Sequence, residues 1–126
     1  MISSVMLYTA SAIVIAWGIA HVAIPTKGIV DGFGPITPDN RRILLMEWLM
    51  EGVLLVFIGV LVALVTIQAA ESERSAMVVY RMAAAALVVM AGVSQFTGAR
   101  TAILPMKLCP AIFLTAAALI FFATVL

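Results

Sequence analysis

The apolar residues of this chain fall into four long runs that are separated by polar segments. The first run, residues 5–24, contains no Asp, Glu, Lys or Arg. About 20 such residues suffice for a helix to cross a hydrocarbon core of about 30 Å. The other runs cover residues 43–69, 77–96 and 103–126. The pattern predicts an all-α protein, a single integral membrane four-helix bundle that occupies residues 1–126.

Composition supports a membrane protein over a soluble one. Apolar residues make up 65% of the chain and charged residues 10%, whereas soluble domains are about 45–50% apolar. We therefore expect the lipid bilayer to be the main partner, and the net charge of +1 argues against a nucleic acid partner. The first residues lack the basic region of a signal peptide, so the first run is expected to stay as a helix. A single cysteine excludes an internal disulfide.

The connections between the runs differ in length and chemistry. Residues 25–42 are rich in Gly and Pro and are predicted to form a loop, long enough to be functional or to fold onto the protein. Near its end, Thr37-Pro38-Asp39 indicates a helix N-cap, a proline at the first helical position and an acid in the first turn. Residues 71–74 are predicted to form a short polar connection. Pro105 and Pro110 predict an irregular or kinked start to the last helix.

The distribution of cations predicts the orientation of the bundle. An even number of spans puts both termini on one side of the membrane. The first and third connections with their flanks carry five Lys and Arg, and the other side carries two. These are Lys27, Arg41, Arg42, Arg100 and Lys107, against Arg74 and Arg81. Because cytoplasmic loops are enriched in Lys and Arg, we expect the first and third connections in the cytoplasm and the termini outside, in the cell inner membrane.

A polar cluster is expected at the cytoplasmic side. Glu47 and Glu51 are four residues apart, so a helix projects both from one face, and such a like-charge pair is destabilising unless something compensates it. The four-span topology brings other polar residues to the same side, and ionisable groups at membrane depth usually face the bundle interior. We therefore predict a polar pocket in one leaflet. Its ligand-binding residues would be His21, Glu47, Glu51, Gln95, Arg100 and Lys107.

Simpler interpretations remain open for several of these residues. Glu47 could lie at the headgroup level and pair with Arg41, Arg42 or Lys107. His21 follows Trp17 by one turn and could be an ordinary interfacial histidine. One His and two Glu could in principle ligate a divalent metal. However, glutamates four residues apart do not form a standard metal signature, so no metal site is predicted.

The sequence also contains a faint internal repeat. The end of the first helix resembles the end of the third, at residues 17–21 and 91–95, and the start of the second resembles the start of the fourth, at residues 43–47 and 103–107. A real repeat would make the bundle two parallel-repeated helical hairpins, related by an axis along the membrane normal. The repeat would then pair polar residues across a central site.

The glycine and histidine that end the first helix, the long Gly/Pro loop and the acid early in the second helix resemble the DoxX-like group of small four-span membrane proteins. The resemblance covers the chain in outline, and no motif carries individual residues across. It implies a functionally mixed group in which some members are tied to quinone or thiol redox systems. The single cysteine, Cys109, argues against a thiol role, so a quinone is the cofactor that the resemblance implies.

Three functions follow from these features. The first is a protein that binds a lipid-like or quinone-like molecule, with Glu51 and His21 as polar anchors in an apolar pocket and Arg100 or Lys107 meeting any acidic group. The second is a membrane enzyme that does acid/base chemistry on an apolar substrate, with Glu51 as base and His21 as acid. The third is an accessory subunit of a membrane complex. Small residues on the second helix, Gly52, Gly59 and Ala63, would then dock a membrane partner or a second copy of the chain.

Overall fold

The structure is a computed structural model that describes residues 2–23, 26–68 and 74–126. Its elements are α1 (Ile2–Ala23), α2 (Thr26–Asp31), α3 (Pro38–Gln68), α4 (Arg74–Phe96), the 3-10 helix η1 (Gly98–Arg100) and α5 (Leu104–Ala123). Four of these helices, α1, α3, α4 and α5, are long and apolar enough to cross a membrane. The described residues contain no strand. The predicted all-α four-helix bundle is therefore confirmed.

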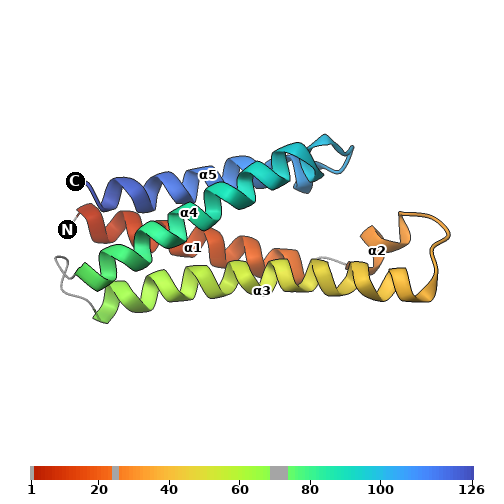
Figure 1. Ribbon diagram of the computed structural model, residues 1–126, viewed down its shortest axis with the longest axis horizontal. Coiled ribbons are helices and arrows are strands. Elements are labelled where there is room, and N and C mark those ends of the chain that lie inside the picture. The colour runs from red at the N-terminus through yellow and green to blue at the C-terminus, as the bar shows by residue number, and fades with distance from the viewer. Residues whose placement is uncertain (1, 24–25, 69–73) are drawn as a thin grey trace.

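The long helices lie roughly side by side, and both termini lie at one end of the bundle (Figure 1). α1 packs against α3 and α5, and α4 packs against α5, so the two hairpins of the predicted repeat each pack as a pair. The core is filled by fully buried side chains such as Leu55, Leu87 and Phe113. In each candidate span, only 28–33% of the apolar window is buried. The remaining apolar surface, including Phe57 and Val89, faces outward, as lipid contact requires.

Glycines bring α1 and α3 into close contact. A Cβ atom added to Gly59 would lie 2.9 Å from the carbonyl oxygen of Ser11, and one added to Gly18 would lie 2.8 Å from that of Gly52. Gly52 and Gly59 are therefore buried against α1, and Ala63 is half-buried. The predicted use of this face by a partner is wrong for the two glycines, because the chain's own first helix already occupies it.

The connection at residues 25–42 is not a simple loop. It contains the six-residue helix α2, which packs on α3 and buries the side chain of Val30. Gly34 then turns the chain with a φ of +79°, in the left-handed region that favours glycine. This arrangement agrees with the prediction that the segment could fold onto the protein. The prediction that all of it is loop is wrong, because residues Thr26–Asp31 form α2.

Both predicted helix starts are found close to the expected residues. The Oγ1 atom of Thr37 accepts a hydrogen bond of 3.2 Å from the backbone N–H of Asn40, and α3 begins at Pro38. α5 begins at Leu104 with Pro105 in its first turn, after the 3-10 turn of η1, and it carries Pro110 inside the helix. The predicted polar connection at residues 71–74 lies outside the described residues, apart from Arg74, which begins α4.

α3 and α4 follow each other in the chain but diverge in space. The hydroxyl groups of Thr66 and Tyr80 are hydrogen-bonded at 3.1 Å, near the end of α3 and the start of α4. Away from this hydrogen bond, α4 leans away from α3 and towards α5 (Figure 1). α3 and α4 therefore lie farther apart at the end of the bundle that carries α2 and η1.

Candidate functional site

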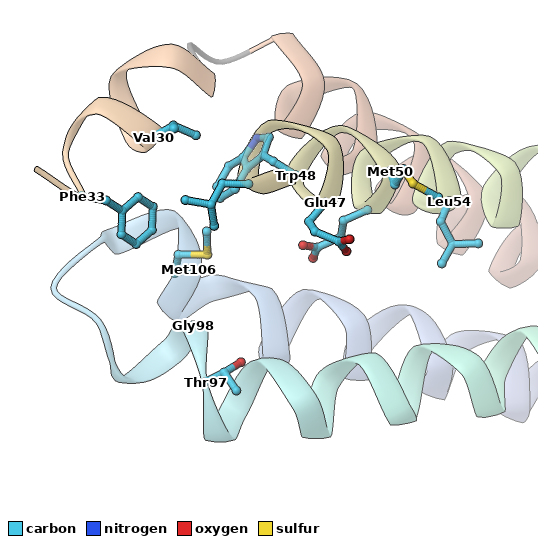
Figure 2. A pocket seen from close by; sticks show the side chains of 11 residues that line it. Val30, Phe33, Glu47, Trp48, Met50, Leu54, Thr97, Gly98 and Met106 are labelled. Carbon is cyan, nitrogen blue, oxygen red and sulfur yellow. The ribbon is translucent and has the colours of Figure 1, made fainter. Parts of the chain in front are cut away.

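A groove occupies the opening between α3 and the η1 end of α4. It has a volume of about 570 Å³, and its walls include Leu44, Met50, Leu54, Val30, Phe33 and Met106. Side chains from α3 face Thr97 and Gly98 across it (Figure 2). A second space of about 280 Å³ continues along α4 and is lined by Met90, Val93 and Ser94. Glu51, Thr97, Gly98 and Met106 line both spaces. We call the two together the lateral groove.

The polar part of the lateral groove centres on Glu51. Its Oε2 atom lies 3.6 Å from Nε2 of His21, and its side chain is 38% exposed. His21 is only 7% exposed, and its Nε2 atom has no hydrogen-bond partner among the described residues. The separation is longer than a hydrogen bond but short enough for one further polar group to contact both atoms. The predicted association of His21 with Glu51 is thus present in the structure.

Trp48 fixes the orientation of His21. The indole and imidazole rings are stacked, with centroids 4.1 Å apart and an angle of 16° between the planes. The indole Nε1–H also donates a hydrogen bond of 2.8 Å to the carbonyl oxygen of His21. The last carbonyls of a helix have no partner within it, so this bond satisfies one of the free acceptors at the end of α1. The sequence analysis did not predict this role of Trp48. The available signal was an indole N–H near the expected start of the second helix, because a buried Trp N–H usually finds a hydrogen-bond partner.

A small cavity also borders His21. Its volume is about 30 Å³, and it is lined by Trp17, His21, Trp48 and Cys109 among others. This exceeds the roughly 10–15 Å³ that one water molecule requires. The Sγ–H group of Cys109 donates to the carbonyl oxygen of Pro105 at 3.4 Å. The cysteine is buried, in agreement with its interpretation as a small packing residue near the helix proline.

The other predicted site residues are distributed unevenly. Glu47 is exposed and lines the lateral groove one helical turn before Glu51, nearer the start of α3. Gln95, Arg100 and Lys107 are exposed and do not line it. The guanidinium of Arg100 lies 5.4 Å from the centroid of the Phe96 ring instead. The structure therefore brings His21, Glu47 and Glu51 together and leaves the three residues from the second hairpin outside. Ser94 of α4 and Thr97, directly after α4, line the groove in their place.

The cations that were expected to answer Glu47 are partly engaged elsewhere. Arg41 forms an ion pair with Asp31 of α2 at 3.0 Å, and Arg42 pairs with Asp39 at 3.2 Å. The first of these pairs ties α2 to the start of α3. Within the described parts of the chain, no cluster of three or more His, Cys, Asp or Glu residues is arranged to hold a metal ion.

The depth of the site follows from the helix ends. α3 has 31 residues, which corresponds to a length of about 46 Å, whereas a hydrocarbon core is about 30 Å thick. α3 therefore extends beyond the core. His21 lies two residues before the end of α1, so the His21–Glu51 pair is close to one membrane face and Glu47 is nearer to water. The arrangement is a groove with apolar walls and an acidic end.

No protein-family model matches this chain, and comparisons with curated proteins and with solved structures find no match. The resemblance to the DoxX-like group therefore stays a prediction, and the function has to be argued from the site.

Proposed function

We propose that this chain is an integral membrane protein that binds a lipid-like or quinone-like molecule in the lateral groove. The observation that carries the proposal is an apolar groove of about 570 Å³ with Glu51 as a convergent polar group beside His21. Small-molecule sites have volumes of about 300–1,000 Å³ and combine apolar walls with a few polar groups that orient the ligand. The excess of Lys and Arg at this end supports an opening towards the cytoplasmic leaflet of the cell inner membrane.

The proposed ligand has an apolar body and one polar end. Leu54, Val93 and Met106 offer contact surface along its body. The carboxylate of Glu51 accepts a hydrogen bond from a hydroxyl at the polar end, and its protonated form donates one to a quinone carbonyl. The hydroxyl of Thr97 lies on the opposite wall. His21 supports Glu51 from inside the bundle, where Trp48 keeps the imidazole in place.

Trp48 makes the proposal testable because it lines the groove. The chain contains two tryptophans, so the substitution Trp17→Phe leaves Trp48 as the single fluorophore. Titration of this variant with a short-chain quinone should quench the emission saturably, since quinones quench tryptophan at contact distance. Adding Glu51→Leu should weaken the apparent affinity about threefold to tenfold, because leucine cannot donate to a quinone carbonyl and a hydrogen bond between neutral groups contributes about 0.5–1.5 kcal/mol.

The control for this titration is Arg81→Gln, which changes an exposed side chain near the other end of the bundle. This variant should bind like the Trp17→Phe parent. Quenching that rises linearly without saturation, and is the same with and without the Glu51 carboxylate, would contradict the proposal.

The 3.6 Å separation between His21 Nε2 and Glu51 Oε2 also favours a second candidate, a membrane enzyme that moves protons on an apolar substrate. In this case Glu51 is the base and His21 the acid. Incubation of the protein with a lipid extract in D₂O, followed by mass spectrometry of the recovered lipids, would detect deuterium bound to carbon. Incorporation that disappears in Glu51→Gln supports the enzyme, and an extract without deuterium in the presence of wild-type protein excludes proton transfer to carbon for those lipids.

A further inference from the structure

A second groove lies between α4 and α5, in the half of the bundle that carries both termini (Figure 1). It has a volume of about 510 Å³, which is within the range of small-molecule sites. The buried residues Ala84 and Ala117 form its floor, because their short side chains leave space between the two helices. We call this space the α4–α5 groove. Its walls are exposed apolar side chains of both helices, Val88, Leu114, Phe121 and Phe122.

The α4–α5 groove has one charged end and one apolar end. Arg81 is the only charged residue that lines it in the described part of the chain. Because α4 and α5 are antiparallel, Arg81 and Phe122 lie towards the termini, whereas Val88 and Leu114 lie nearer the middle of the bundle (Figure 1). The distance along α4 from Arg81 to Val88 is about 10 Å. The groove therefore runs from one membrane face towards the bilayer centre, with its cation nearer the face.

The described chain supplies no anion for Arg81. Neither α4 nor α5 contains an Asp or a Glu, and Arg81 takes part in no ion pair or hydrogen bond among the described residues. A cation within a membrane span is costly, and most such cations face the bundle interior or pair with another group. Arg81 is instead exposed on the outer surface. Its long side chain can extend towards the head groups, so the lipid itself is the remaining source of an anion.

We infer that the α4–α5 groove binds an anionic phospholipid, whose phosphate pairs with Arg81 while one acyl chain lies over Ala84 and Ala117. A guanidinium presents a planar fork of donors that matches the oxygens of a phosphate. The apolar walls then contact the part of the acyl chain that is nearest the head group. No residue lines both this groove and the lateral groove, so the inference does not depend on the proposed function.

Two phospholipids with the same acyl chains and different head-group charge test the inference, dioleoyl phosphatidylglycerol and dioleoyl phosphatidylcholine. Each is added to the detergent-purified protein, and the retained fraction is read by native mass spectrometry. The anionic lipid should be retained about fivefold more strongly than the zwitterionic one, which is the expected effect of one basic side chain near the membrane surface.

Two variants test the charge and the shape of the groove independently. Arg81→Gln should lower retention of phosphatidylglycerol to that of phosphatidylcholine. Its matched control is Arg74→Gln, which removes the same charge from an exposed residue at the start of α4 that does not line the groove, and which should keep the preference. Ala118→Leu fills the groove without a change of charge and should reduce retention of both lipids. Ala86→Leu, at an exposed alanine outside the groove, should not.

Three results would overturn the inference. Equal retention of the two lipids by the wild-type protein would mean that lipids contact this surface without selection. A preference that survives in Arg81→Gln, or that is lost equally in Arg74→Gln, would assign it to the overall charge of this end. A dimer that forms without added lipid, and that Ala118→Leu disrupts while Ala86→Leu does not, would place a second copy of the chain in the groove. None of these results changes the quinone titration, in which Arg81→Gln should bind normally.

Discussion

The contact between α1 and α3 at Gly59 offers the sharpest test of the packing. The substitution Gly59→Ala adds one methyl group at a point where the helices already touch. The added Cβ would lie 2.6 Å from Cγ1 of Ile15 and 2.9 Å from the carbonyl oxygen of Ser11. The isoleucine side chain can move away, but the carbonyl oxygen belongs to the backbone of α1. The helices must therefore separate, or α1 must shift along α3.

The expected cost follows from two opposing effects. Overpacking of a well-packed contact costs about 1–3 kcal/mol. Alanine is favoured over glycine inside a helix by about 1 kcal/mol, which offsets part of this cost. Gly92 in α4 separates the two effects, because a Cβ added there meets no atom within 4 Å. Gly92→Ala should be neutral or stabilising, and Gly59→Ala should be less stable than Gly92→Ala by about 1–3 kcal/mol.

Reversible unfolding of both variants in mixed micelles, followed by far-UV circular dichroism as the fraction of denaturing detergent rises, measures this difference. The helical content at the start of the titration should be the same for both. If Gly59→Ala is as stable as Gly92→Ala, the close approach of α1 to α3 at this position is wrong. The burial of the glycine face would then have to be reconsidered, and with it the exclusion of a docking partner there.

Further substitutions probe the site and the α3–α4 junction. Trp48→Phe keeps an aromatic ring against His21 but removes the indole N–H, and should lower the free energy of unfolding by about 0.5–1.5 kcal/mol in the same micelle assay. Tyr80→Phe removes the hydroxyl that bonds Thr66; we expect a loss of similar size, about 0.5–1.5 kcal/mol, and faster amide exchange in the last turn of α3. Glu51→Leu should be at least as stable as the wild type by thermal denaturation, because an acidic group within a membrane span costs free energy, yet it should bind the quinone more weakly. A Glu51→Leu protein that melts well below the wild type would show that the carboxylate has a structural role instead.

The parts of the fold that depend on local sequence were predictable. Four apolar runs gave the four spans, and the cap at Thr37 placed the start of α3 at Pro38. α2 was not predicted because Gly28 and Gly32 disfavour a helix in isolation. Its formation depends on tertiary contact, since Val30 is buried against α3 and Asp31 is paired with Arg41.

The sequence predicted how deep in the membrane the site residues lie, but not which of their side chains face one another. Residues near the ends of spans share a level in the membrane, and this brought His21 and Glu51 into one prediction. The direction of a side chain around its helix changes by about 100° with each residue. The sequence did not determine these directions, because they depend on which helices pack together. α4 turns towards α5, so Ser94 and Thr97 line the groove while Gln95, between them, is exposed.

The divergence of α3 from α4 affects how a ligand would compete for the groove. An opening between two spans faces the interior of the bilayer, so a ligand reaches it by diffusion within the leaflet. Its occupancy then depends on the mole fraction of the ligand among the lipids, and the concentration in water matters only through partitioning. Ordinary lipid tails are present there in large excess and can fill the apolar walls equally well. Binding is then an exchange between components of the same leaflet, and the groove can discriminate between them mainly at the Glu51 end, where their head groups differ.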